Sequence, residues 1–213
     1  MVSSNFYEGS NSVWSYSCMS PLTAGTSNKD ANPLFVSEAA GNYRLQAGSP
    51  CIDAGTSAGA DNADLEGTSR PLDGNADGTA AFDMGAFEFA SSLVDSDADG
   101  LSDAAELLYG TGVLVPDSDG DRMLDGDEVI AGTDPLNARS LFELDTASAT
   151  ETNGFVIRWP SASNRYYDLA KTIDLRTNFS NLETNISARP PENSYTDSVA
   201  GESRKFYRIK VRQ

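Results

Sequence analysis

Two stretches of the chain carry acidic side chains at the spacing that a calcium-binding loop requires. In each, carboxylates stand at positions 1, 3, 5, 9 and 12 of a twelve-residue segment. Alternate residues of such a tight loop point inward, so this spacing brings several carboxylates to one point. The carboxylate at position 12 reaches back from the first turn of a following helix and can bind with both oxygens. The two sets are Asp95, Asp97, Asp99, Asp103 and Glu106, and Asp117, Asp119, Asp121, Asp125 and Glu128.

The backbone of the two loops has requirements of its own. Position 7 supplies a carbonyl oxygen, which belongs to Leu101 in the first loop and to Met123 in the second. Position 6 takes a turn that favours glycine, and Gly100 stands there in the first loop. Arg122 occupies this position in the second loop. Arg122 must therefore accept the turn or force a different loop path.

All of these ligands are hard oxygens, and several are anionic. Such a set selects Ca²⁺ over transition metals by ligand type, and over Mg²⁺ by coordination number. Without a cation, five carboxylates in one loop repel one another strongly. A solvated acidic linker is the alternative. The sequence predicts two calcium sites, each followed by a short helix, at Asp103–Tyr109 and Asp125–Ala131.

Residues 95–106 and the later Gly132-Thr-Asp-Pro135 resemble the bacterial thrombospondin type 3-like calcium repeat. Its consensus is roughly D-x-D-x-D-G-L-x-D-x-x-E followed by GTDP. The resemblance implies structural repeats in which calcium rigidifies a segment between domains, and it implies Asp134 as an added ligand. The first repeat departs from the consensus, because residues 110–116 replace its GTDP ending. The loops also resemble those of dockerins, which leaves a docking module as an alternative.

Composition and charge exclude several other kinds of site. The 213 residues include no histidine, which excludes Ser-His-Asp and Cys-His catalysis and the usual zinc ligand sets. The formal net charge is −17, and residues 93–134 hold twelve acidic residues against one basic residue. So acidic a chain is not expected to bind nucleic acid or an anionic membrane surface. No long apolar run is present, so no membrane insertion is expected.

Residues 1–92 are rich in turn residues between short apolar runs, which favours short strands and tight turns over helices. Three motifs resemble the closing segment of bacterial right-handed parallel β-helix proteins. The resemblance implies the terminal rung and cap of an extracellular or cell-surface protein whose β-helix body lies upstream, so we expect the chain to be a piece of a larger protein. The motifs are Asp30-Ala-Asn-Pro-Leu-Phe-Val36, residues 42–55 with the letters NYRLQAGSPCIDAG, and Phe82-Asp-Met-Gly-Ala-Phe-Glu88.

Side chains of this segment offer two further kinds of chemistry. Cys18 and Cys51 fit either a disulfide or two buried thiols, and an exported protein favours the disulfide. Asp53, Asp83 and Glu88 are candidate carboxylates for glycoside or uronate chemistry. Asp residues beside glycine more commonly cap turns by bonding to the backbone, and we favour that role here.

Residues 139–213 change to alternating patterns, which predicts a small β-sandwich. The segment resembles fibronectin-sized modules at the ends of exported bacterial proteins, a resemblance that implies no catalytic residues. Trp159, Tyr166 and Tyr167 are candidates for stacking on sugars, although core and cross-strand packing is the favoured alternative. In the last run, alternation puts Phe206, Arg208 and Lys210 on one face and Tyr207, Ile209 and Val211 on the other.

These patterns predict a mainly β chain in three parts. They are a β-helix terminal rung and cap (1–92), a linker of two short calcium loop-helix repeats (93–138) and a small β-sandwich (139–213). The predicted function is calcium-dependent structural support or surface interaction outside a bacterial cell, secreted or at its surface, without catalysis in these residues. Calcium is the expected partner, with a polysaccharide or cell-surface component as a second. The alternative is a carbohydrate-binding or accessory region of a polysaccharide lyase or glycoside hydrolase.

Overall fold

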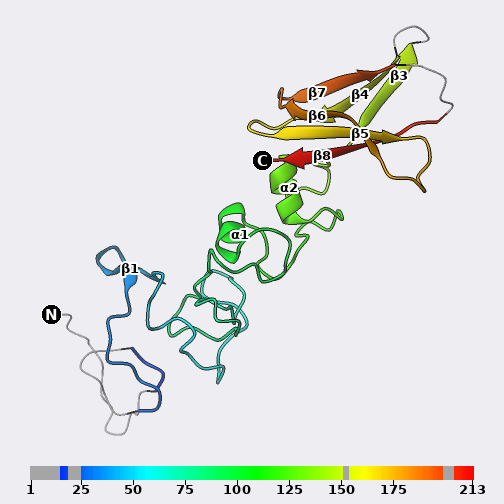
Figure 1. Ribbon diagram of the computed structural model, residues 1–213. Coiled ribbons are helices and arrows are strands. Elements are labelled where there is room, and N and C mark those ends of the chain that lie inside the picture. Colours follow the sequence, from blue (N-terminus) through cyan, green and yellow to red (C-terminus); the bar gives the residue numbers. More distant parts are fainter. Residues whose placement is uncertain (1–14, 19–24, 151–153, 199–203) are drawn as a thin grey trace. The chain divides into compact units, whose positions relative to one another are not determined.

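A computed structural model describes residues 15–18, 25–150, 154–198 and 204–213 (Figure 1). The chain divides into two compact units, Met1–Pro116 and Asp117–Gln213, so the first acidic loop belongs to one unit and the second loop to the other. In the described ranges, strands outnumber helices, and both α-helices have only seven residues. The prediction of a mainly β chain with two short helices is confirmed. No helix in these ranges is long and apolar enough to cross a bilayer.

The N-terminal part of the first unit has little regular structure. Strands β1 (Phe35–Ser37) and β2 (Asn42–Leu45) pair antiparallel, and the 3₁₀ helix η1 (Glu38–Ala40) connects them. Elsewhere the described residues up to 92 form turns and isolated bridges, so the β-helix rung stays a prediction. A small core holds this segment together. Its buried side chains are Leu45, Cys51, Ile52 and Met84, with Cys18, Phe35, Ala54 and Phe89 packed against them.

Two of the three N-terminal motifs lie side by side, although about 30 residues separate them in the chain. The N–H of Gly55 donates to the Phe82 carbonyl at 2.6 Å, and the N–H of Met84 donates to the Cys51 carbonyl at 2.9 Å. A Cβ on Gly55 would lie 2.5 Å from the carbonyl oxygen of Asp83. Only glycine allows so close an approach of the two backbones.

The predicted disulfide is not present, because Cys18 and Cys51 are both free. The Cys18 thiol donates to the Ala31 carbonyl at 3.3 Å, and Cys51 is buried in the small core. Burial, together with a hydrogen bond with Cys18, raises the pKa of the Cys51 thiol to about 12. Such a thiol holds almost no thiolate at neutral pH and is therefore unreactive. The structure corresponds to the other expectation, two packed thiols.

The second unit contains two three-stranded antiparallel sheets, called here the sheet pair. One sheet has the order β3–β4–β7 and the other the order β6–β5–β8. The strands are β3 (Asp145–Thr150), β4 (Gly154–Pro160), β5 (Tyr166–Thr172), β6 (Ser180–Ser187), β7 (Glu192–Asp197) and β8 (Phe206–Arg212).

The two sheets pack face to face around aromatic and aliphatic side chains. Trp159 of β4 meets Tyr167 of β5 edge to face, with ring centroids 5.9 Å apart. Because β4 and β5 belong to different sheets, this contact joins the layers. The alternation predicted for the last strand is confirmed, since its apolar set packs on the core and its basic side chains are exposed. The core residues are Ile157, Trp159, Tyr167 and Leu169, and Tyr207, Ile209 and Val211 pack against them.

The two short helices follow the acidic loops with the predicted bounds, α1 at Asp103–Tyr109 and α2 at Asp125–Ala131. Each helix ends at a glycine in the left-handed region, Gly110 with φ +81° and Gly132 with φ +84°. Such a glycine ends a helix because its positive φ directs the chain out of the helical path, while its N–H still donates to a carbonyl of the last turn. The helices are therefore long enough to carry the carboxylates of their first turn and little more.

Candidate calcium loops

The carboxylates at positions 1, 3 and 5 converge in both loops. Within each set, carboxylate oxygens of the three residues lie within 4.8 Å of one another. Like charges at this spacing repel, and a divalent cation among them replaces the repulsion by attraction. The structure thus brings together the first three predicted ligands of each site. The sets are Asp95, Asp97 and Asp99, and Asp117, Asp119 and Asp121.

Backbone N–H groups hold both loops in the same pattern. The amide at position 6 donates to the carboxylate at position 1, and the amide at position 7 donates to the carboxylate at position 5. This pattern fixes the turn around the carboxylates; the carbonyls of Leu101 and Met123 as ligands stay a prediction. The bonds are Gly100 N to Asp95 Oδ2 (3.0 Å), Leu101 N to Asp99 Oδ1 (2.6 Å), Arg122 N to Asp117 Oδ2 (2.9 Å) and Met123 N to Asp121 Oδ1 (2.7 Å).

Arg122 accepts the turn instead of forcing a different loop path. Its φ is +85°, close to the +103° of Gly100 at the same position of the first loop. A side chain in this left-handed region costs roughly 1–2 kcal/mol. The second loop therefore has the shape of the first, with added backbone strain at one residue.

The carboxylates at position 9 fasten each loop to the start of its helix. Asp103 and Asp125 have no exposed surface. Asp103 accepts from the backbone N–H and the hydroxyl of Ser96, both at 2.9 Å, and Asp125 accepts from those of Ser118 at 2.8 and 2.6 Å. Both oxygens of each carboxylate thus support the loop. A direct contact of Asp103 or Asp125 with an ion stays a prediction.

The glutamates at position 12, Glu106 and Glu128, are also fully buried. In the described structure, neither carboxylate oxygen of Glu128 has a hydrogen-bond partner, nor does Oδ2 of Asp119 or of Asp121. Burial, together with the nearby charges of Asp121 and Asp119, raises the pKa of Glu128 to about 7. A buried ionised carboxylate without a partner costs several kcal/mol.

The oxygen atoms of this loop therefore fit a bound calcium ion. Glu128 would hold it together with Asp117, Asp119 and Asp121, and the ion would supply the charge that these buried oxygens lack. The same positions in the first loop are acidic and similarly placed. Ligand type and charge agree with Ca²⁺ in both loops.

Asp134, the added ligand that the repeat consensus implies, lies apart from this arrangement. Its side chain is exposed, and its Oδ1 accepts from the N–H of Leu136 at 3.2 Å. Among the described residues it belongs to none of the acidic groups. The contact that the structure gives it is a turn cap, and its role as a ligand stays a prediction.

A turn with the same backbone pattern occurs earlier in the chain, at residues 73–79. The N–H of Gly78 donates to Asp73 at 2.7 Å, and the N–H of Thr79 donates to Asp77 at 2.9 Å. These bonds repeat the position 6 to 1 and position 7 to 5 bonds of the calcium loops. Gly78 also has φ +89°.

This turn differs from the two loops in what surrounds it. Position 12 of the turn is Met84, which offers no carboxylate, and Asp77 is exposed. Asp53 takes the supporting role of position 9, because its Oδ1 accepts from the N–H of Gly74 at 3.3 Å. This role has no local signal in the sequence, since Asp53 lies 20 residues before the turn begins. A buried glutamate is thus what separates the two calcium loops from a turn of similar shape.

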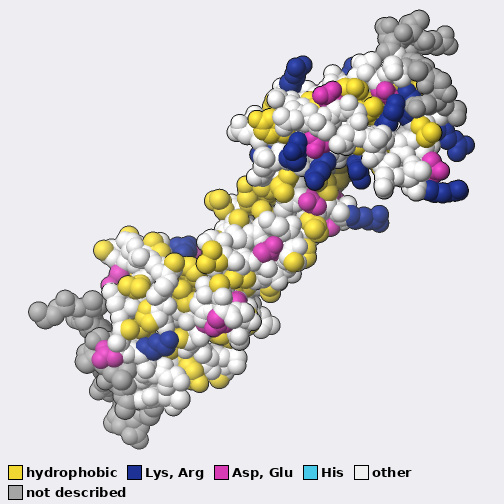
Figure 2. All heavy atoms as spheres, in the orientation of Figure 1, with side chains coloured by type: hydrophobic (Ala, Val, Ile, Leu, Met, Phe, Trp, Pro, Cys, Tyr) yellow, Lys and Arg dark blue, Asp and Glu magenta, His cyan; other side chains and the backbone are white. Residues whose placement is uncertain are grey.

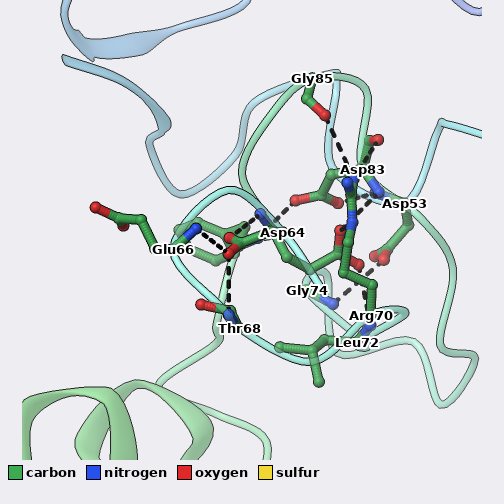
Figure 3. A network of polar contacts seen from close by, with 11 residues as sticks. Asp53, Asp64, Glu66, Thr68, Arg70, Leu72, Gly74, Asp83 and Gly85 are labelled. Atoms are coloured by element: carbon green, nitrogen blue, oxygen red, sulfur yellow. Dashed lines mark hydrogen bonds and ion pairs between the residues drawn. The ribbon is translucent and has the colours of Figure 1, made fainter. Parts of the chain in front are cut away.

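Two candidate catalytic carboxylates of the N-terminal segment, Asp53 and Asp83, lie in one polar network (Figure 3), and Glu88 joins it through hydrogen bonds. Glu88 forms a buried ion pair with Arg70, whose Nε lies 2.8 Å from Oε2, and the side chains are 1% and 10% exposed. Glu88 also accepts from the N–H groups of Leu72 at 3.0 Å and of Asp83 at 3.2 Å. Its carboxylate therefore connects three backbone segments.

Asp83 is held in the same way. Its carboxylate accepts from the N–H of Asp53 at 2.7 Å and from the N–H of Phe89 at 2.6 Å. Burial raises the pKa of Asp83 to about 7, and the nearby charge of Glu88 contributes to the rise. Backbone donors thus occupy Asp53, Asp83 and Glu88 alike, as expected for carboxylates that cap turns.

Two of the three candidate sugar-stacking aromatics are unavailable. Trp159 and Tyr167 are 1% and 0% exposed and form the core of the sheet pair, so neither can present its ring to a sugar. The packing alternative accounts for both. Tyr166 is 42% exposed at the start of β5.

Residues 95–111 and 117–138 match the family model of the bacterial TSP3 repeat. No curated protein and no solved structure matches the chain. The matched segments begin at the first ligand of each loop and include α1 and α2. The two acidic loops and their helices therefore match the bacterial TSP3 repeat, which is a structural calcium-binding module.

Proposed function

We propose that the chain is a calcium-stabilised structural region of an extracellular bacterial protein, with one Ca²⁺ in each loop. The ions rigidify the segment between the N-terminal β structure and the C-terminal sheet pair. The observation that carries this proposal is Glu128, a fully buried carboxylate whose oxygens have no hydrogen-bond partner in the described structure and which belongs to a loop of converging acids.

Binding and stability together test the proposal. Titration calorimetry with Ca²⁺ should give two equivalents per chain. The melting temperature should rise with Ca²⁺ and fall when a chelator is added, because an ion that binds only the folded loops stabilises by mass action. At a Ca²⁺ concentration about 100 times the dissociation constant, each site contributes roughly 2.7 kcal/mol. A chelated protein that melts at the same temperature would contradict the proposal.

Single substitutions assign the ions to the loops. Glu106→Gln and Glu128→Gln should each remove about one equivalent of bound Ca²⁺, because an amide loses both the charge and bidentate binding. Asp127→Asn is the matched control for the second loop. It removes one negative charge from the same helix, but Asp127 is exposed and outside the acidic group. Its stoichiometry should stay at two.

The exposed ring of Tyr166 supports a second, separate proposal, contact with a polysaccharide at the bacterial surface. Retardation of the chain in affinity gels that contain polysaccharide tests it. Tyr166→Ala should lose the retardation and keep its melting temperature. Retardation that persists in this variant would exclude Tyr166 as the stacking residue.

A further inference from the structure

A side chain that lies directly before β5 caps the C-terminal end of α2, the helix of the second calcium loop. Arg165 lies directly before β5, and its guanidinium donates to two consecutive carbonyl oxygens at the end of α2. Its Nε lies 2.7 Å from the Ile130 oxygen and its Nη2 lies 3.0 Å from the Val129 oxygen. The last carbonyls of a helix have no donor within the helix, so this contact satisfies groups that α2 itself leaves open.

Arg165 is itself hydrogen-bonded to the sheet pair. The carbonyl of Arg165 accepts from the N–H of Ala188 at 3.0 Å, directly after β6. Arg165 belongs to the connection between β4 and β5. The end of α2 also approaches this connection closely, because a Cβ on Gly132 would lie 2.3 Å from Cβ of Ala162. α2 also contacts β8. The end of α2 is thus packed on the sheets and not merely tethered to them.

The beginning of the same helix belongs to the calcium loop. Asp125 and Glu128 both lie on α2 and are fully buried, and Glu128 directly precedes Val129, one of the two acceptors of Arg165. α2 makes less than two full turns, so its two ends cannot move independently. The hydrogen bonds from Arg165 that orient α2 therefore also orient Glu128 toward its loop.

We infer that Arg165 couples calcium binding in the second loop to the stability of the sheet pair. The inference rests on the proposed calcium site. Calcium orders α2 from one end, and the ordered helix presents its carbonyls to Arg165 at the other. Linkage makes this effect reciprocal. Removing the Arg165 contact should therefore weaken calcium binding, and it should reduce the stabilisation of the sheets by calcium by the same free energy.

The full chain offers a clean test, because Trp159 lies in the core of the sheet pair and its fluorescence reports the melting of the sheets. The background carries Trp14→Phe, which leaves one tryptophan, and Glu106→Gln, which removes binding at the first loop. Arg165→Met should bind Ca²⁺ about 5-fold more weakly or worse by calorimetry. Its Trp159 transition should show little or no rise with saturating Ca²⁺, whereas the background protein shows a clear rise.

Arg158→Met is the matched control. Arg158 is an exposed residue of β4 that pairs with Glu192 at 3.8 Å, and its loss should leave both the affinity and the calcium-dependent shift unchanged. Should Arg165→Met fail to fold, Arg165→Lys keeps the charge without the forked donor, and an intermediate shift is expected.

The outcomes separate the inference from the calcium site itself. Absence of Ca²⁺ binding in the background protein overturns the proposed function. Binding with no shift of the Trp159 transition overturns only the coupling. A shift in Arg165→Met as large as that of the background protein also overturns it, because the contact would then carry no coupling.

Discussion

Arg122 and Gly100 occupy the same position of two loops with nearly the same backbone angle. Arg122→Gly should therefore relieve strain in the second loop and tighten its Ca²⁺ binding by about 1 kcal/mol, roughly 5-fold. Calorimetry on the full chain measures this change. The substitution also removes a positive charge near the loop. This loss reduces the repulsion of Ca²⁺ and should tighten binding independently of the backbone strain.

Arg122→Ala separates the two effects, because it removes the same charge and keeps a Cβ in the left-handed region. We expect Arg122→Gly to bind more tightly than Arg122→Ala. Equal affinities of the two variants would show that backbone strain plays no part.

The raised pKa of Asp83 predicts that the free energy of unfolding depends on pH. Its pKa in the folded chain is about 7, above its ordinary value of 3.8, so the folded state holds the proton more tightly. The stabilisation is fully present below about pH 4 and is lost as the pH rises through about 7. The free energy of unfolding should fall over this window, by up to about 4 kcal/mol from this group alone.

Asp83→Asn isolates this contribution from the other carboxylates. The variant loses one acceptor for a backbone N–H, so it starts less stable at low pH. Its free energy of unfolding should fall less between about pH 4 and 7. The difference in this free energy between the variant and the unmodified protein therefore becomes smaller as the pH rises. Denaturant unfolding at saturating Ca²⁺ measures both curves, and parallel curves would rule out titration of Asp83 in this range.

Among the elements of the N-terminal segment, Glu88 joins turns that lie apart in the chain, through its contacts with Arg70 and Leu72. Glu88→Gln would leave the guanidinium of Arg70 buried without its counter-ion, which typically costs 3–5 kcal/mol. Glu66→Gln removes the same kind of partner from Arg44. The side chains of Arg44 and Glu66 are 48% and 45% exposed, so this loss should reduce the free energy of unfolding by less than about 1 kcal/mol. Denaturant unfolding monitored by circular dichroism compares the variants, and similar losses in both would contradict the role of Glu88.

The elements that could be predicted are those fixed by local rules. The bounds of α1 and α2 follow from the ligand spacing before them and the glycines after them, all within about twelve residues of sequence. The alternation of the last strand similarly depends on its own residues and one buried face.

What could not be predicted depends on pairs that are distant in the chain. Asp53 supports the turn at 73–79, and Arg165 caps the last carbonyls of α2, whose Ile130 lies 35 residues earlier in the chain. Neither contact leaves a local signal, because an aspartate in a turn or an arginine before a strand is common. The disulfide prediction was wrong for a related reason, since it rested on the expected export of the protein and not on how the two thiols pack.

At the scale of the whole molecule, charge is divided unevenly along the chain. Basic side chains gather on the visible surface of the C-terminal sheets (Figure 2). Residues 141–213 hold nine acidic and ten basic residues, whereas residues 93–134 have a net charge of −11. Self-repulsion in the calcium-free protein is therefore concentrated in the two loops and their surroundings.

This distribution predicts that monovalent salt affects the melting temperature more without Ca²⁺ than with it. In chelator, KCl raised from about 20 to 300 mM should increase the melting temperature by a few degrees, because it screens the carboxylates from one another. At saturating Ca²⁺ the increase should be smaller or absent, because two bound ions already neutralise four charges and salt weakens their attraction to the loops. Glu106→Gln/Glu128→Gln should respond to salt alike with and without Ca²⁺. An equal rise for the unmodified protein in both conditions would mean that the repulsion lies outside the loops.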